Sequence, residues 1–237
     1  MRKTKIVCTL GPSSLHRETL AAMIRAGMDI ARLNTSHGTL EEHVRTVTLV
    51  REVSAEVGKI VGVLMDLSGP KLRTGETEFG RTLELVIGAE IRLTNRHVPG
   101  TEHLLTVEYP RLTEDVRAGE RVLLDDGKVE LEVLRSSPEG LDCRVLSGGP
   151  LGPHKGVSFP QTILTTPALT ERDKDAIRAG VGAGVDYFAL SFVCDGADLV
   201  RTREFINSLG ADTPIIAKIE RRQASRTSTR WLPNQTV

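Results

Sequence analysis

Short apolar runs alternate with segments of helical period in the first 70 or so residues, and the same rhythm returns after residue 156. Apolar runs of about four to eight residues bounded by turn residues predict buried strands, and apolar positions three and four apart predict helices. The predicted strands are Lys5–Leu10, Asp29–Ser36, Ile60–Asp66, Tyr187–Val193 and Pro214–Glu220. The predicted helices begin at Ser13 or Ser14, at Thr39, at Thr170 and at Gly196, and they end near Gly27, Gly58, Gly180 and Gly210.

The segment between these two parts has a different pattern, with short alternating runs and no helical period. It predicts strands at Thr82–Ile87, Glu90–Leu93, Arg121–Leu124, Val129–Leu134 and Leu141–Leu146. Asp125-Asp126-Gly127-Lys128 is typical of a hairpin turn between two of them. We therefore expect a small all-β domain, of β-barrel type, inserted at residues 76–155.

Strands that alternate with helices indicate parallel βαβ units. Five such strands in residues 1–75 and 156–220 predict an α/β fold, a (β/α)8 TIM-type barrel that is truncated. A complete barrel takes roughly 250 residues. An open three-layer α/β sheet is the alternative.

Composition narrows the class of protein. The formal net charge is zero, so nothing favours nucleic acid or an anionic membrane as a partner. No apolar run approaches the roughly 20 residues of a membrane-spanning helix. The basic residues after Met1 are not followed by the apolar stretch of a signal peptide. Cys8, Cys143 and Cys194 are isolated, which predicts reduced thiols. We expect a soluble, cytoplasmic protein.

Polar residues gather where the predicted parallel strands end, and such ends form the active site of a barrel. Lys218 and Glu220 are two residues apart and share a face of their strand. The other members of this set are Arg32, Asn34, Ser36, Asp66, Lys71, Arg73 and Ser191. Cations suit a phosphate, and carboxylates with other oxygen donors suit a hard metal such as Mg²⁺. The set predicts phosphoryl transfer or enolate chemistry on a phosphorylated or dicarboxylate substrate.

Each of these residues taken singly has an ordinary explanation. Lys218 and Glu220 could form a simple strand-end ion pair, and Asp66 could shape the turn that follows it. The convergence of the whole set is what favours a functional site. The Gly-rich phosphate-binding motifs of P-loop and Rossmann proteins do not occur.

Several motifs resemble those of one enzyme family and occur in the same order as in that family. They are KIVCTLGPSS at 5–14, MDIARLNTSHG at 28–38, MDLSGPKLRTG at 65–75, LDDG at 124–127, KGVSFP at 155–160, LTERDKD at 169–175, LSFV at 190–193 and IAKIE at 216–220. Together they resemble the N-terminal part of pyruvate kinase over residues 1–220. That family transfers a phosphoryl group from phosphoenolpyruvate to ADP in glycolysis, and its full-length members are homo-oligomers.

The resemblance implies a role for each matching residue. The implied catalytic residues are Lys218, Arg32 and Arg73. The implied phosphoenolpyruvate-binding residues are these three and Ser191, and the implied ADP/ATP-binding residues are His37, Lys155 and Asp126. Glu220 would hold Mg²⁺ or Mn²⁺. Asn34, Ser36, Asp66 and the carbonyl of Leu67 match the site for a monovalent cation. The β domain would act as a lid over the reacting groups.

Some positions depart from the family pattern. Lys71 stands where many members have Glu, so its ammonium is expected to replace K⁺, and Leu67 stands where they have Thr. Thr35 replaces the usual Phe, and Cys194 replaces a common Arg.

After Glu220 the sequence departs from the family pattern. Residues 221–237 are expected to form a disordered or out-of-frame tail, which would leave the chain truncated and inactive by itself. One alternative is a non-catalytic fragment that binds phosphoenolpyruvate or associates with a partner. Another is a barrel lyase or aldolase that uses an enolate and Mg²⁺, because a fold alone does not determine the reaction.

Overall fold

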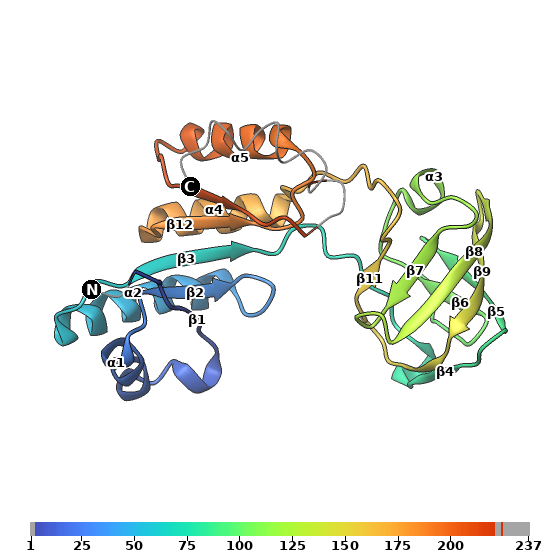
Figure 1. Ribbon diagram of the computed structural model, residues 1–237, viewed down its shortest axis with the longest axis horizontal. Coiled ribbons are helices and arrows are strands. Elements are labelled where there is room, and N and C mark those ends of the chain that lie inside the picture. The colour runs from blue at the N-terminus through green and yellow to red at the C-terminus, as the bar shows by residue number, and fades with distance from the viewer. Residues whose placement is uncertain (1–2, 221–223, 225–237) are drawn as a thin grey trace. The chain divides into compact units, whose positions relative to one another are not determined.

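The computed structural model describes residues 3–220 and Ala224 (Figure 1). Contacts divide the chain into two compact units. Unit 1 contains the described residues up to Pro70 and from Pro167 onward, and unit 2 contains Lys71–Thr166. The boundaries expected from the sequence, at 75/76 and 155/156, lie inside unit 2.

Unit 1 is built on a five-stranded, wholly parallel sheet in the order β1–β2–β3–β12–β13. Spatial order follows chain order, as right-handed βαβ units produce when each new strand is added at the same edge. The strands are β1 (Val7–Thr9), β2 (Ile30–Asn34), β3 (Gly62–Leu67), β12 (Tyr187–Leu190) and β13 (Ile215–Ala217).

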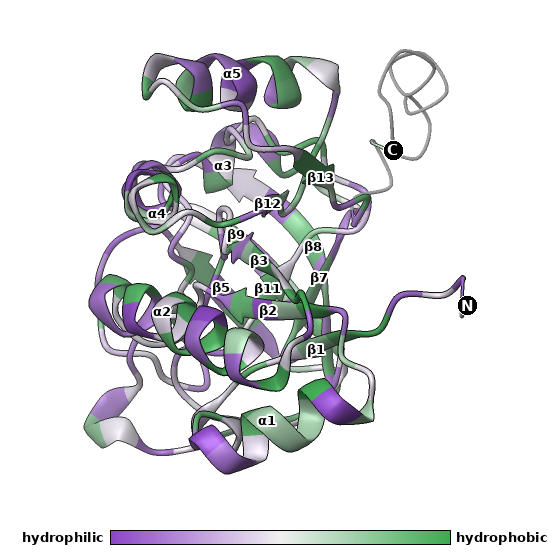
Figure 2. Cartoon of the chain, turned by 90° about the vertical axis from the view of Figure 1, so that its left-hand side faces the viewer, coloured by the Kyte–Doolittle hydropathy of each residue, from purple (hydrophilic) through white to green (hydrophobic). Residues whose placement is uncertain are grey.

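The helices of unit 1 are α1 (Arg17–Ala26), α2 (Leu40–Val57), α4 (Glu171–Ala183) and α5 (Gly196–Ser208). Figure 2 shows them following one another along one side of the strands, and consecutive helices contact each other. A three-layer sheet would instead carry helices on both faces. The predicted α/β class with a parallel sheet is therefore confirmed, and the arrangement is that of a curled, barrel-type half rather than of the open sheet.

Local sequence explains where most of these helices begin and end. Thr39 and Thr170 each cap a helix by accepting a hydrogen bond from the third backbone N–H, in a capping box. Gly58 ends α2 in the left-handed conformation that glycine adopts without steric cost. The expected cap at Ser13 or Ser14 is wrong, because Pro12–Ser14 forms a 3₁₀ turn in which Ser14 bonds to Gly11, so α1 begins only after His16.

The core of unit 1 lies between the sheet and the helices. Leu20 and Ile24 of α1 are fully buried in it, and Met23 packs against it while partly exposed. The outer strands differ from expectation. Val7 in β1 and Ile216 in β13 are exposed, so these strands are not the buried ones that the apolar runs predicted. Within the described residues each pairs with a neighbour on one side only, and periodicity does not reveal a strand's place in its sheet.

Unit 2 contains a six-stranded sheet in the order β11–β7–β8–β9–β5–β6 and a two-stranded sheet of β10 and β4. Its strands are β4 (Leu83–Leu85), β5 (Glu90–Thr94), β6 (Leu104–Thr106), β7 (Arg121–Leu124), β8 (Val129–Ser137), β9 (Gly140–Ser147), β10 (Gly149–Leu151) and β11 (Val157–Ser158). Every predicted run contains a strand. The periodicity missed β6, β10, β11, the helix α3 (Leu112–Asp115) and the 3₁₀ turn Glu78–Gly80 because all are short.

The predicted hairpin is present between β7 and β8. Asp125, Asp126 and Gly127 take positive φ angles of 49°, 58° and 86°, a conformation that Asp and Gly tolerate better than most residues. A separate hydrophobic core, which includes Tyr109 and Cys143, lies inside unit 2. Among the described residues, no helix is long and apolar enough to cross a membrane.

Candidate functional site

The polar side chains predicted for unit 1 meet at the carboxyl ends of its strands. The sheet register pairs Asn34 with Asp66, and Leu190 with both Leu67 and Ala217. Ser191 and Lys218 each follow one residue beyond that level. Residues distant in sequence are therefore neighbours at one edge of the sheet, as expected for a parallel α/β fold.

Asp66 is the centre of this group. Its side chain is only 3% exposed and accepts hydrogen bonds from Arg32 through Nε, at 2.8 Å, and through Nη2. Lys218 Nζ lies 3.2 and 3.3 Å from its two carboxylate oxygens, and Ser191 Oγ lies 3.3 Å from Oδ1. A carboxylate withdrawn from water needs such partners, and here two cations supply them.

Lys218 joins Asp66 to the remaining members. Its ammonium donates to Ser191 Oγ at 2.8 Å and lies 3.2 Å from Glu220 Oε1. Lys218 and Glu220 therefore point together as predicted, but the predicted strand is too long, because β13 ends at Ala217 and both residues lie beyond it. The Lys218 side chain keeps 28% of its surface exposed, so the ammonium is accessible. The two cations, Arg32 and Lys218, are matched by the carboxylates of Asp66 and Glu220. A phosphate that displaced one of these carboxylates would still face the same two cations.

Phe192 belongs to this site although no sequence signal indicated it. Its φ of 56° is an outlier for a bulky residue, and its backbone N–H donates to Glu220 Oε2 at 3.0 Å. The ring lies against Gly69, where an added Cβ would come within 2.9 Å of Cδ2. The strained backbone therefore holds the Glu220 carboxylate, with glycine leaving room for the ring.

Asp173 is a second residue that the sequence reasoning did not select. It is completely buried, and its Oδ1 accepts from Ser68 Oγ at 3.3 Å and from Gly69 N at 3.2 Å. Its Oδ2 accepts from Thr170 N at 3.0 Å and from Thr170 Oγ1 at 2.6 Å. It ties the turn after β3 to the start of α4. The Thr-x-x-Asp spacing of a capping box is the signal that could have found it.

The residues expected to hold a monovalent cation lie close to Asp66. Asn34 Oδ1 accepts from Ser36 N at 3.1 Å, and the Asp66 carbonyl accepts from Thr35 N at 3.0 Å and from Thr35 Oγ1 at 2.9 Å. The Asp66 carboxylate itself is directed at Arg32 and Lys218. Leu67 is buried at the end of β3. Among the described residues, no three or more His, Cys, Asp or Glu side chains gather as metal ligands would.

The other predicted residues lie in a loop of unit 1 and in unit 2. His37 is exposed between β2 and α2, and its carbonyl accepts from His43 Nε2 at 2.9 Å. In unit 2, Arg73 Nη1 donates to the His154 carbonyl at 2.7 Å, and Lys155 Nζ lies 3.3 Å from Asp125 Oδ1.

Those unit 2 residues form one group, because Arg73 pairs with Gly156 in an isolated β-bridge and a Cβ on Gly156 would lie 4.0 Å from Asp126 Oδ1. The pKa of Asp125 is lowered, chiefly by its hydrogen bond from Lys128 and also by Lys155. Lys71 is the first residue of unit 2.

Comparison with known proteins places this sequence in a family. The family model described as "Pyruvate kinase, barrel domain" matches residues 1–229, beyond Glu220, where the motifs had suggested that the resemblance stops. The expected tail at 221–237 lies outside the described residues except for Ala224.

Curated relatives agree with the family model. Pyruvate kinases from Mycobacterium tuberculosis and Thermococcus litoralis are 41% and 40% identical, each over 94% of this chain and 47% of their own length. The pyruvate kinase of Sporosarcina psychrophila is 42% identical over 94% of this chain and 38% of its own length. The chain thus spans half or less of the length of these relatives. On the family model and these identities, the chain belongs to the pyruvate kinase family.

Proposed function

We propose that this chain contains the phosphoenolpyruvate-binding residues of a pyruvate kinase. In the pyruvate kinase reaction, phosphoenolpyruvate and ADP give pyruvate and ATP. The observation that carries the proposal is the position of the Lys218 ammonium. It is accessible at the carboxyl edge of a parallel sheet and is held by Ser191, Asp66 and Glu220. Fixed cations at such an edge suit the charge that develops on a transferring phosphoryl group and on an enolate.

In this proposal Lys218 is the catalytic cation and Arg32 binds the substrate phosphate. Both side chains are only partly buried, so a phosphate oxygen could reach them. Ser191 orients the ammonium by accepting its 2.8 Å hydrogen bond. Asp66 holds both cations in place, since its buried carboxylate contacts each of them. Arg73 of unit 2 is proposed as a second residue that binds the substrate phosphate.

Glu220 fits a divalent cation, because its exposed carboxylate offers the hard oxygen donors that Mg²⁺ or Mn²⁺ prefers. When bound, that ion would neutralise charge on the phosphoryl oxygens. The described residues offer few other acidic ligands nearby. Magnesium binding by this chain should therefore be weak alone and stronger with phosphoenolpyruvate, whose phosphate supplies further ligands. For the same reason we expect little or no turnover by the chain alone.

Nucleotide contacts are proposed for His37, Lys155 and Asp126. Lys155 supplies a cation, and Asp126 lies in the β7–β8 turn close to it. We propose that unit 2 is the inserted β domain of the family and that it acts as a lid that excludes water from the reaction.

A titration of the purified chain tests the proposal. Isothermal calorimetry with phosphoenolpyruvate and MgCl₂ should show binding that weakens about tenfold or more in Lys218→Met, because a charge-assisted hydrogen bond to the substrate is removed. Lys174→Met is the matched control, since Lys174 is 30% exposed and also has an acidic partner. A Lys218→Met variant that binds phosphoenolpyruvate as tightly as Lys174→Met does would refute the role of Lys218. A lactate dehydrogenase-coupled assay measures turnover in the same samples.

The monovalent-cation site provides a separate test. Asn34, Ser36, Asp66 and the Leu67 carbonyl would form it, and we propose that Lys71 supplies the positive charge that K⁺ supplies in relatives with Glu at this position. In the complete enzyme, turnover should then depend little on KCl at constant ionic strength. A many-fold gain in turnover on adding KCl would contradict this role of Lys71.

A further inference from the structure

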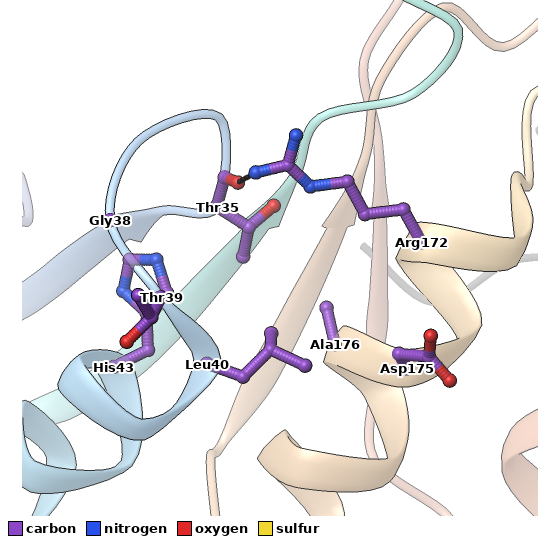
Figure 3. A pocket seen from close by; sticks show the side chains of 8 residues that line it. All are labelled: Thr35, Gly38, Thr39, Leu40, His43, Arg172, Asp175 and Ala176. Atoms are coloured by element: carbon purple, nitrogen blue, oxygen red, sulfur yellow. Dashed lines mark hydrogen bonds between the residues drawn. The ribbon is translucent and has the colours of Figure 1, made fainter.

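A pocket of about 340 Å³ lies in unit 1, away from the carboxylate and cation cluster. Figure 3 shows it between the loop after β2, the first turn of α2 and the first turns of α4. Leu40 and Ala176 form an apolar floor, Thr35 and His43 form the sides, and Arg172 reaches over the top. Its volume falls within the range of pockets that hold small organic molecules, about 300 Å³ and above.

Arg172 gives the pocket a positive charge that is not ion-paired within the described residues. Within the described part of the chain Arg172 forms no ion pair, whereas its neighbours on α4 do: Lys174 lies 2.7 Å from Glu171, and Arg178 lies 2.6 Å from Asp175. The only hydrogen bond of Arg172 in that part runs from Nη2 to the Thr35 carbonyl at 3.2 Å. A guanidinium has five N–H donors in a planar fork, so most of them remain available.

The other polar groups of the pocket are already engaged. The Asp175 carboxylate is held by Arg178, and His43 Nε2 donates to the His37 carbonyl. Below them the buried Ala176 and the Leu40 side chain offer apolar surface. The chemistry of the pocket is therefore one available guanidinium above an apolar floor.

We propose that this pocket binds a small carboxylate with a compact apolar body, with the carboxylate on Arg172 and the apolar part between Leu40 and Ala176. A carboxylate matches the fork of a guanidinium in a bidentate pair, which a neutral amide cannot do. This site is distinct from the proposed phosphoenolpyruvate site and does not depend on it.

Thr35 lies between the two sites. Its carbonyl accepts from Arg172, while its Oγ1 and backbone N–H both donate to the Asp66 carbonyl. A carboxylate that draws Arg172 away from the Thr35 carbonyl would therefore remove a hydrogen bond from a residue that is itself hydrogen-bonded to Asp66.

Nuclear magnetic resonance titration of the ¹⁵N-labelled full chain tests the proposal with benzoate and its neutral analogue benzamide. Benzoate should cause saturable shifts at the amides of Thr35, Leu40 and Ala176, and benzamide should bind about tenfold more weakly. Arg172→Gln should weaken benzoate binding by a similar factor. Lys174→Gln is the matched control, because it removes a positive charge from the same helix, and both Lys174 and its partner Glu171 lie outside the pocket lining.

Thr35→Phe places a ring where the apolar body would sit and should abolish benzoate binding while leaving Arg172 present. Arg172 is exposed, so its substitution leaves the core intact. The benzoate affinity of Arg172→Gln therefore tests the proposal even if Thr35→Phe fails to fold. Any one of three results would overturn the proposal: no saturable shifts with benzoate, equal affinity for benzamide, or unchanged benzoate affinity in Arg172→Gln.

Discussion

Asp173→Asn is predicted to destabilise unit 1 strongly although it changes one atom and almost no volume. Each carboxylate oxygen of Asp173 accepts two hydrogen bonds, Oδ1 from Ser68 and Gly69 and Oδ2 from Thr170. An amide nitrogen in place of either oxygen faces two donors. The hydroxyls can rotate away, but one backbone N–H, of Gly69 or of Thr170, is left opposite another donor.

The magnitude follows from the hydrogen bonds that the substitution removes. Two hydrogen bonds to a charged acceptor contribute about 1.5–3 kcal/mol each. The neutral Asn side chain also removes the cost of burying a full negative charge, which offsets part of their loss. We therefore expect the free energy of unfolding to fall by about 2–4 kcal/mol. Asp175→Asn on the same helix is the control. Its carboxylate is 59% exposed in a surface pair with Arg178, so the expected loss is below about 1 kcal/mol.

Urea unfolding followed by far-ultraviolet circular dichroism is the assay. The helix signal reports mainly on unit 1, because α1, α2, α4 and α5 lie there and the helix α3 of unit 2 has only four residues. With a slope of about 1–3 kcal/mol per molar urea, the midpoint should fall by roughly 1 M or more. A midpoint shift no larger than that of Asp175→Asn would show that the four hydrogen bonds at Asp173 do not hold the turn after β3.

Three further outcomes can be checked on the same protein. Gly69→Ala should lower the free energy of unfolding in urea by about 2–4 kcal/mol, because φ is +63° and the new Cβ would meet Phe192. Gly58→Ala is the control and should lower it by only about 1 kcal/mol, because φ is +72° and nothing lies within 4 Å of the new Cβ. Thr39→Ala should lower the free energy of unfolding by about 1 kcal/mol through loss of the α2 cap, and no change in the midpoint would contradict this. Burial raises the pKa of the Cys143 thiol from 9.0 to about 12, so iodoacetamide should label this thiol only after unfolding. Because the pKa is higher in the folded state, the thiol's contribution to stability is complete below pH 9.0 and is lost as the pH rises toward 12. Labelling of the native protein at neutral pH would refute the burial of Cys143.

Much of the secondary structure could be predicted because its causes are local. The capping boxes at Thr39 and Thr170 and the turn at Asp125–Gly127 depend on residues a few positions apart. The alternation of side chains along an extended strand is also local, which is why Lys218 and Glu220 were expected on one face. The family motifs then implied a role for each polar residue at the predicted strand ends.

Other features depend on contacts between distant residues. Asp66 lies between Arg32 and Lys218, which are 34 and 152 positions away, and only the register of four consecutive strands, β2, β3, β12 and β13, brings them within hydrogen-bonding distance. The exposure of β1 and β13 depends likewise on their places in the sheet, which an apolar run does not encode.

The same limit applies to the residues that sequence reasoning missed. Phe192 has an unusual backbone angle because Gly69 and Glu220 surround it, and Arg172 overhangs a pocket because α4 packs beside the loop after β2. The sequence by itself determined the longer elements and their order, and it indicated the residues that are proposed for the chemistry. Tertiary structure decided which of those residues meet, because strand register and helix packing depend on the whole core rather than on neighbouring side chains.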